Sequence, residues 1–331
     1  MRIAVDAMGG DYAPGEVIKG AQLAAAEYAV EILLVGNSET LKAELDHQGP
    51  DRITIVHASE VIHMDDQPAL ALRRKKNASI AVATSLVKSG EALGLVSAGS
   101  TGAQMAAALL TLGRLPGISR PAIATLVPTL AGPKVLLDAG ANVDCKPQHL
   151  VQFAGMGSIY AEKILGIKAP RVGLLNVGVE ITKGNELTLA AYPLLQQSGL
   201  NFIGNIEPRE IPTGECDVIV CDGFVGNCLL KFGEGLASAA LNMLKEEIGR
   251  HLLSRMGAAL LVPSLKFMGA RFDYSEYGGA PLLGVNGVSI VCHGSSRAKA
   301  IKNAIRLAMQ CVENRFVEHI GQSMAGLKGE E

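Results

Sequence analysis

The sequence predicts an α/β fold with a doubly wound, mostly parallel sheet in an α/β/α sandwich. Three observations predict it: short apolar runs alternate with helical patterns, glycines follow many of these runs, and polar residues gather where the runs end. The chain has 331 residues, of which 48% are hydrophobic and 38 are glycine, so it can bury a sizeable core and form many tight turns. We expect one domain over residues 1–331.

The expected strands are short, and each stops at a polar or glycine-rich turn. In chain order they span residues 3–6, 32–35, 53–56, 93–96, 123–127, 135–137, 172–175, 202–203, 218–220 and 288–291. A helical pattern follows the first strand from Glu16 onward, with Val17, Ile18 and Ala21 on its apolar face. Ligands of such folds bind outside the carboxyl ends of the strands.

Polar residues stand where that rule needs them. The residues that follow expected strand ends are Asp6, Ser97, Ser100, Thr101, Asp138, Asn142, Asn176, Lys183, Asn205, Glu207, Asp222, Asn227, His293, Ser295 and Ser296. Asparagine and aspartate also form turns and helix caps, so any one of these residues has a structural interpretation. Together they favour a shared binding cleft.

The loop between the strand at 172–175 and the next helix is the clearest candidate for an anion site. Gly178 and Gly184 let backbone N–H groups approach a ligand, Lys183 supplies a cation, and the helix after Asn185 offers the positive end of its dipole. An ordinary strand-to-helix turn with a solvated lysine is the alternative. The loop is not a Walker motif, because Lys183 precedes the second glycine.

Two stretches depart from the alternation. Arg73, Arg74, Lys75 and Lys76 form a run of cations that is either a solvated face or a docking surface for an acidic partner. An amphipathic helical hairpin is expected at about residues 237–271. Its apolar stripe is buried in the core and a dimer interface, or it contacts a membrane surface or an acyl chain. The candidate residues for membrane contact are Leu253, Met256, Leu260 and Leu261.

Composition excludes several classes. A net charge of −2, 4% aromatic residues and no tryptophan argue against a nucleic-acid binder. The six cysteines show neither zinc spacing nor a C-x-x-C pair, so we interpret them as reduced thiols and expect no metal site. No signal core or membrane-length apolar run is visible, which predicts a cytoplasmic protein and leaves peripheral membrane contact open.

Several motifs carry a resemblance to a known family. D-A-M-G-G-D, S-A-G-S-T-G-A, L-D-A-G-A-N-V-D-C-K-P, L-N-V-G-V-E-I-T-K-G-N-E, F-I-G-N-I-E-P-R-E, D-G-F-V-G-N, E-Y-G-G-A-P-L-L-G-V-N-G and H-G-S-S occur in that order. The chain therefore resembles phosphate acyltransferases of the PlsX family over almost its whole length. Ser100, Ala78 and Val179 depart from that family's usual Asn, Ser and Glu, which leaves Glu180 as the one acid of its loop.

The resemblance implies an enzyme that moves an acyl group from acyl-acyl carrier protein to inorganic phosphate for phospholipid synthesis. It also implies a homodimer with a fold like isopropylmalate dehydrogenase and phosphotransacetylase, and we expect no cofactor. A membrane surface and a downstream membrane acyltransferase are further candidate partners. Phosphate itself is the nucleophile we favour, since no cysteine has an evident base beside it.

The candidate residues fall into two groups. The catalytic candidates are Lys183, His293, Asn227 and Asp222, where His293 or Lys183 could protonate the leaving thiolate and Asn227 or His293 could stabilise the oxyanion. The candidates for substrate binding are Ser97, Ser100, Thr101, Asp138, Asn142, Asn176, Gly178, Gly184, Asn185, Ser295 and Ser296. The alternatives are a phosphotransacetylase-like enzyme, a metal- and nicotinamide-dependent dehydrogenase of this fold with aspartate ligands, and a non-catalytic membrane-associated scaffold.

Overall fold

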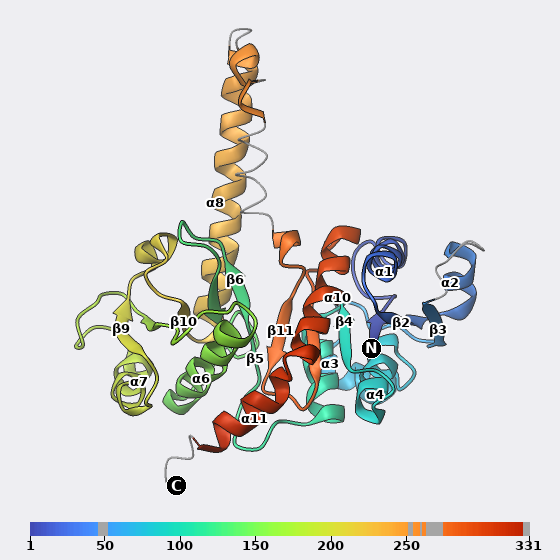
Figure 1. Cartoon of the computed structure of the whole chain (residues 1–331), viewed down its shortest axis with the longest axis horizontal. Coiled ribbons are helices and arrows are strands. Elements are labelled where there is room, and N and C mark those ends of the chain that lie inside the picture. The colour runs from blue at the N-terminus through green and yellow to red at the C-terminus, as the bar shows by residue number, and fades with distance from the viewer. Residues whose placement is uncertain (46–51, 251–253, 259, 263–273, 327–331) are drawn as a thin grey trace.

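The strands form two sheets, which are joined where the chain passes from β5 to β6 (Figure 1). The computed structural model describes residues 1–45, 52–250, 254–258, 260–262 and 274–326. The seven-stranded sheet has the order β3-β2-β1-β4-β12-β11-β5, and the five-stranded sheet has the order β6-β7-β10-β8-β9.

The strand bounds, sheet by sheet, are as follows. The larger sheet comprises β1 (Arg2–Asp6), β2 (Glu31–Gly36), β3 (Ile53–His57), β4 (Gly94–Ser97), β5 (Ala122–Ile123), β11 (Ala280–Leu283) and β12 (Val288–Val291). The smaller sheet comprises β6 (Thr125–Val127), β7 (Lys134–Leu137), β8 (Val172–Leu175), β9 (Phe202–Ile206) and β10 (Val218–Val220).

The described helices connect these strands. They are α1 (Gly15–Glu27), α2 (Ser38–Glu44), α3 (Pro68–Arg74), α4 (Ser79–Ser89), α5 (Thr101–Ala107), α6 (Pro147–Lys163), α7 (Glu186–Gln197), α8 (Gly223–Arg250), α10 (Ala298–Glu313) and α11 (Phe316–Gly326). Three shorter turns are the π-helix η1 (Ala108–Leu112) and the 3₁₀-helices η2 (Pro208–Thr213) and η3 (Tyr274–Glu276).

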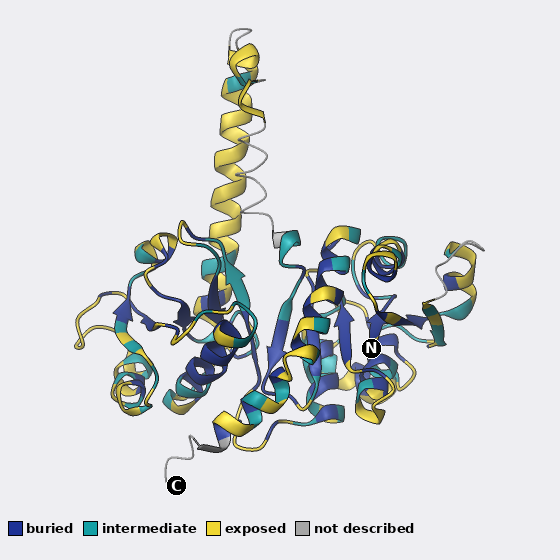
Figure 2. Cartoon of the chain, viewed as in Figure 1, coloured by how far each residue is buried: buried dark blue, intermediate teal, exposed yellow. Residues whose placement is uncertain are grey.

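Helices cover both faces of the larger sheet, as the sequence predicts for an α/β fold. Successive side chains of a strand point to opposite faces. In β1, Ile3 and Val5 join one core cluster with Ile18 of α1 and Ile305 of α10, whereas Ala4 joins another with residues of α3, α4 and α5. The α/β prediction is therefore confirmed, and Figure 2 shows the buried strands between more exposed helices.

One expected strand is wrong. Residues 123–127 are not a single strand, because the chain crosses from one sheet to the other at Ala124, whose N–H donates to Pro281 O at 3.1 Å. β5 pairs antiparallel with β11, and β6 pairs antiparallel with β7. Antiparallel partners therefore flank the crossing between the two sheets, and the parallel strands carry the turns described below.

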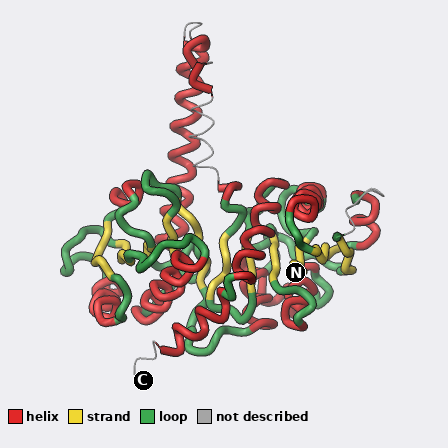
Figure 3. Tube along the Cα trace, viewed as in Figure 1, coloured by secondary structure: helices red, strands yellow, loops and turns green. Residues whose placement is uncertain are grey.

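The helical segment expected at about residues 237–271 begins earlier in the chain, at Gly223, and is called the α8 excursion below. α8 is one continuous helix from Gly223, directly after β10, and it projects far from both sheets (Figure 3). Its exposed apolar residues include Phe232 and Leu236, and Met256, Leu260 and Leu261 beyond it are also exposed. Leu253 and residues 263–271 of the expected hairpin lie outside the described residues.

Candidate active site

Three loops meet at the carboxyl ends of β1, β4 and β12, which are parallel neighbours in the larger sheet. Asp11 N, in the loop after β1, donates to Gly294 O in the loop after β12 at 2.8 Å. A Cβ on Gly9 would lie 2.7 Å from Gly99 N in the loop after β4. Only glycine allows that approach, so the loops after β1 and β4 touch through their backbones.

Buried polar side chains at the ends of β1 and β4 hold these loops in place through hydrogen bonds. Asp6 is 2% exposed and its carboxylate accepts hydrogen bonds from Ser97 Oγ at 2.8 Å and from Met8 N at 3.2 Å. Ser97 Oγ in turn accepts Gly99 N at 3.1 Å. Burial raises the pKa of Asp6, while hydrogen bonds from Ser79 and Ser97 act in the opposite direction.

The loop after β12 contributes groups that face outward. His293 is exposed, and its Nδ1 lies 2.7 Å from Ser295 Oγ and accepts the Ser295 N–H at 3.2 Å. Because Nδ1 is an acceptor there, the neutral ring carries its proton on Nε2 and can donate it. Ser296, by contrast, is buried at 3% exposure, and among the described residues its hydroxyl has no hydrogen-bond partner.

A second set of loops is organised around Asp138, at the carboxyl end of β7. Its carboxylate is fully buried and accepts hydrogen bonds from the N–H groups of Ile123, Gly140, Ala141 and Asn142 and from Asn142 Nδ2, at 2.6 to 3.2 Å. Burial raises the pKa of Asp138, and the N–H donors oppose that shift. The side chain therefore shapes the turn of residues 138–142.

The start of α8 is packed on this turn. A Cβ on Gly226 would lie 2.0 Å from Asp138 O, and Gly223 N donates to Asn142 O at 2.8 Å. Asp222 caps the helix, since its Oδ1 accepts Val225 N at 2.9 Å. A Cβ on Gly140 would lie 3.5 Å from Cβ of Asn227, which is exposed, so the D-G-F-V-G-N motif and the Asp138 turn pack as one unit.

The two sets of loops are joined at the boundary between the sheets. Ile123, whose N–H donates to Asp138, belongs to β5 of the larger sheet, and Ala139 N donates back to Ile123 O at 2.9 Å. Met105 of α5 packs in the same apolar cluster as Ala139 and Ala141. The turn at residues 138–142 and the helix that follows the loop at residues 97–101 thus pack against one shared apolar cluster.

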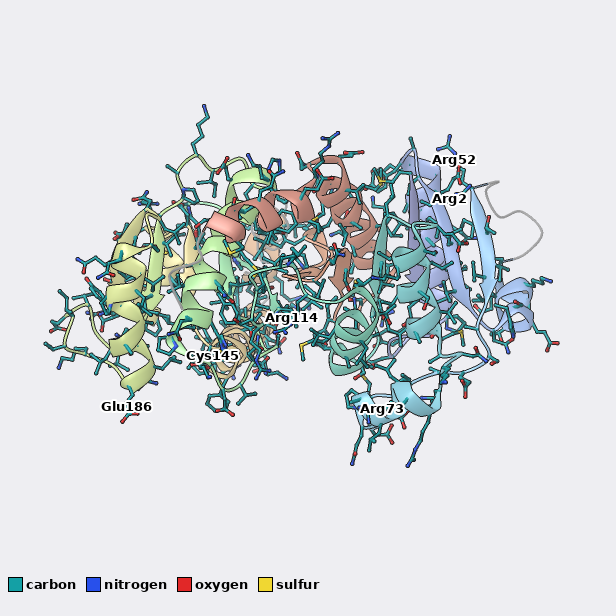
Figure 4. The ribbon with its side chains drawn as sticks, turned by 90° about the horizontal axis from the view of Figure 1, so that it is seen from below. Arg2, Arg52, Arg73, Arg114, Cys145 and Glu186 are labelled. Carbon is teal, nitrogen blue, oxygen red and sulfur yellow. The ribbon has the colours of Figure 1, made fainter. Side chains whose placement is uncertain are left out.

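The loop that contains Lys183 lies elsewhere. β8 is next to the outer edge of the smaller sheet, and the following loop projects from that edge, away from the larger sheet (Figure 1). Glu186, at the start of α7, lies at the opposite end of the molecule from Arg2 and Arg52 in Figure 4. Val177, Val179 and Ile181 in this loop are 76%, 52% and 60% exposed.

The Lys183 loop is nevertheless well defined. Asn176 Nδ2 donates to Lys183 O and Asn205 Nδ2 donates to Glu180 O, both at 3.0 Å. Gly184 has a φ of +115°, which a side chain would strain, and Asn185 caps α7 by accepting Thr188 N at 2.9 Å. Lys183 itself is exposed, so the loop presents its cation on a fixed backbone.

The predicted substrate-binding residues divide by exposure. Ser97, Asp138, Asn142, Asn176 and Ser296 are buried, and except for Ser296 their polar groups already bond to the surrounding backbone or side chains. Ser100 caps α5 by accepting Ala103 N at 3.4 Å. Gly178 is also buried. The exposed or partly exposed substrate-binding candidates are Ser100, Thr101, Gly184, Asn185 and Ser295. The catalytic candidates Lys183, Asp222, Asn227 and His293 are likewise exposed or partly exposed. Most of the polar residues therefore build turns, and fewer can meet a ligand directly.

Two other expectations concern thiols and metals. Burial raises the pKa of the partly buried Cys145 to about 12, and the carboxylates of Asp138 and Asp222 add to the shift. Cys145 is therefore a poor nucleophile. Within the described residues, no three histidine, cysteine, aspartate or glutamate side chains come together as a metal site.

Of the four cations at residues 73–76 that are expected to dock an acidic partner, one is used within the chain. Lys75 Nζ bonds to Asp66 Oδ2 at 2.6 Å and to Val61 O at 2.9 Å, so it holds the loop before α3. Arg73, Arg74 and Lys76 are exposed, and Arg73 points away from the body of the chain in Figure 4.

The sequence is similar to a known family and to curated proteins over almost its whole length. A family model described as "Fatty acid synthesis protein" matches residues 1–319. The chain is 62% identical over 322 residues to the phosphate acyltransferase of Moorella thermoacetica, covering 97% of this chain and 95% of that one. It is 61% identical over 329 residues to the phosphate acyltransferase of Pelotomaculum thermopropionicum, covering 99% and 96%.

Solved structures show the same fold at low identity. A phosphotransacetylase from Streptococcus pyogenes superimposes with a TM-score of 0.63 at 19% identity, covering 96% of this chain and 94% of that chain. A branched-chain phosphotransacylase from Enterococcus faecalis superimposes with a TM-score of 0.61 at 17% identity, covering 94% and 99%. The expected phosphotransacetylase-like fold is confirmed.

Proposed function

The chain belongs to the fatty acid synthesis protein family, and we propose that it transfers a fatty acyl group from acyl-acyl carrier protein to inorganic phosphate. The observation that carries this proposal is the near full-length relation to phosphate acyltransferases. The loops support it, because glycine-rich turns held by buried side chains leave backbone N–H groups and small donors to bind an anion. The product is an acyl phosphate, a precursor for phospholipid synthesis.

The proposed reaction needs positioning more than strong base catalysis. A phosphate oxygen attacks the thioester carbon, the carbonyl electrons move onto oxygen, and their return expels the carrier's thiolate. Asn227, exposed beside the Asp138 turn, is the proposed donor to the oxyanion. His293 Nε2 is the proposed proton donor to the departing thiolate, while Asp222 holds the first turn of α8 in place.

The exposed surface supports the proposal of a homodimer. Val177, Val179 and Ile181 expose β-branched side chains on a loop with a fixed backbone, and exposed apolar residues recur along α8. Contiguous exposed apolar surface favours a protein or membrane contact. A second copy packed on the 177–181 loop would cover these side chains, and it would give Lys183 a cleft of the partner to act in.

A docking surface for the carrier protein is proposed at Arg73, Arg74 and Lys76. These cations are exposed on one turn, and exposed Leu70 lies on the same helix one turn away. Such a patch attracts an acidic partner. Changing Arg74 and Lys76 to Glu should raise the KM for acyl carrier protein at least several-fold and leave the KM for phosphate unchanged. Lys42→Glu, on α2, is the control, and equal changes in both KM values would contradict the docking role.

Membrane contact is proposed for the exposed apolar residues at the far end of the α8 excursion. Met256, Leu260 and Leu261 are 62%, 84% and 56% exposed, and the described part of the chain has no helix that could cross a bilayer. A peripheral contact would release the acyl phosphate beside a membrane acyltransferase. Leu261→Glu should abolish flotation with anionic liposomes and preserve the dimer and its activity in solution. Unchanged flotation would contradict the contact.

One assay tests the central proposal. Acyl phosphate formation is measured with acyl-carrier-protein and acyl-coenzyme A donors, with and without phosphate. We expect phosphate-dependent loss of the thioester, with the carrier-protein donor preferred. Preference for coenzyme A would favour the phosphotransacetylase-like alternative, whose fold this chain shares. Thioester loss without phosphate, or none at all, would contradict the proposed function.

A further inference from the structure

Asp6 is a buried carboxylate for which the proposed reaction has no direct use. We propose that Asp6 is a positioning residue for phosphate: it holds the Ser97 hydroxyl, which holds the N–H of Gly99, and so fixes the turn that receives the anion. This inference rests on the proposed function and names a residue that determines how well its inorganic substrate binds.

The position of Asp6 in the sheet makes the first link. β1 lies between β2 and β4, and Asp6 is in register with Ser97 of β4. A carboxylate can only accept, so the Ser97 hydroxyl must direct its proton to Asp6 Oδ2, at 2.8 Å. The lone pairs of Ser97 Oγ are then free to accept Gly99 N, at 3.1 Å. The charge of Asp6 thus sets the direction of both hydrogen bonds.

The same carboxylate also fixes the loop after β1. Met8 N donates to Asp6 Oδ1 at 3.2 Å, and a Cβ on Gly9 would lie 2.8 Å from Asp6 Oδ2 and 2.7 Å from Gly99 N. The turns after β1 and β4 therefore pack against each other and against one side chain. A change at Asp6 must move both turns.

The space around Asp6 decides between positioning and contact with substrate. The cavity lined by Asp6, Gly9, Ser79, Ser97, Gly99 and Ser100 measures about 10 Å³. That is room for about one water molecule and too little for phosphate. Asp6 and Ser97 are 2% and 1% exposed, so neither touches the anion. In this proposal they act on the anion indirectly, by fixing the backbone of residues 97–101.

The variants Asp6→Asn, Ser97→Ala and their combination test this inference. The Asp6→Asn change would put an N–H₂ group or a single oxygen where two acceptors are needed, which reverses or removes the bond to Ser97. Each single change should raise the KM for phosphate about tenfold and leave the KM for the acyl donor within about twofold. Because both changes break the same bond between Asp6 and Ser97, their effects on the KM for phosphate should be less than additive in the double variant.

The matched control is Asp217→Asn. Asp217 is a 6% exposed aspartate at the opposite, amino-terminal end of β10. Its replacement should lower the melting temperature and leave the KM for phosphate unchanged. If Asp6→Asn fails to fold, Ser97→Ala carries the test, because it removes the same bridge without placing an amide in the core.

The contradicting outcomes are distinct. Additive effects in the double variant would show that Asp6 does not act through Ser97. Equal rises in both KM values, or no rise in the KM for phosphate, would remove the positioning role. A wild-type protein without phosphate-dependent activity would contradict the proposed function alone. Inorganic phosphate should still raise its melting temperature, and Asp6→Asn should reduce that rise.

Discussion

Two buried aspartates at opposite ends of neighbouring strands have different partners. Asp217 precedes β10, and its carboxylate bonds to Lys134 Nζ at 2.6 Å and to Arg171 Nε at 3.1 Å. Asp138 follows β7, the strand paired with β10, and accepts N–H groups of its own turn. Burial acts to raise the pKa of both, but the Arg171 and Lys134 hydrogen bonds outweigh it at Asp217 and lower its pKa to about 2.

The difference indicates what each end of the strands is built for. At the amino end, cations neutralise the buried carboxylate, and the network ties β7, β8 and β10 together. At the carboxyl end, Asp138 and Asp6 use their oxygens to orient backbone N–H and hydroxyl groups. The first arrangement serves stability, and the second shapes turns at the edge where α/β proteins bind ligands.

The largest effect is expected at Asp138. Asp138→Asn places an amide N–H₂ against one set of N–H donors, leaving donors on Asn142 or on the 140–141 turn unpaired at about 1–3 kcal/mol each. The turn supports the start of α8, so activity should fall at least about 100-fold. Melting temperature and acyl phosphate formation are measured together. Activity above a tenth of wild type would show that the turn is not part of the site.

Lys183→Ala should have the next largest effect. The side chain is exposed, so the melting temperature should change little, while loss of an electrostatic contact in the transition state costs about 2–4 kcal/mol of its stabilisation. Lys183→Arg should restore activity only in part, because a guanidinium differs in shape and hydration. Wild-type turnover in the alanine variant would remove Lys183 from the site.

Mixing variants shows whose site Lys183 serves. If Lys183 acts in the partner's cleft, a dimer of one Lys183→Ala copy and one His293→Ala copy contains one intact site. A random mixture should then recover about a quarter of wild-type activity. Recovery that stays at the level of the separate variants would place Lys183 with the His293 of its own chain.

The carboxyl ends of several strands could be predicted from the sequence alone. Apolar runs that stop at aspartate, serine or glycine predicted the carboxyl ends of β1, β4, β7 and β10, because burial and turn chemistry are local properties. Local pattern could not tell which polar residues face a ligand. Ser97 and Asp138 were predicted to bind substrate. Both are buried and form hydrogen bonds to groups that only the folded sheets bring near.

The other features that the sequence did not predict also depend on contacts between residues far apart in the chain. Residues 123–127 look like one strand, and the sheet crossing at Ala124 depends on Pro281, far away in the sequence. Asp6 was one polar strand end among many, and its special role became visible only with the register that sets it beside Ser97. The start of α8 at Gly223 follows from close backbone packing on Asp138, which composition does not encode.

A moderate effect on stability is expected as the pH falls. The pKa of Asp217 is about 2 in the folded chain, against about 3.9 when unfolded. A lowered pKa stabilises the fold above the unfolded value, and this contribution is lost as the pH falls from about 4 toward 2. It amounts to about 2–3 kcal/mol. Urea unfolding of wild type and Asp217→Asn should converge toward pH 2, and parallel curves would contradict the cation-paired network.

The smallest effect is expected at Cys145, which lies close to Asp138 and Asp222 at the carboxyl ends of the strands. Burial raises its pKa to about 12, so almost none of it is thiolate at neutral pH, and its Sγ lies 3.7 Å from Asn142 O as a weak donor. A residue at this edge therefore need not take part in chemistry. Cys145→Ser keeps a hydroxyl donor of similar size and should retain turnover within about twofold if phosphate attacks the thioester directly. Rapid-quench measurements should show no acylated protein in either form. A burst of acyl-enzyme in the wild type that Cys145→Ser abolishes, together with its turnover, would replace direct attack by a two-step transfer through this thiol.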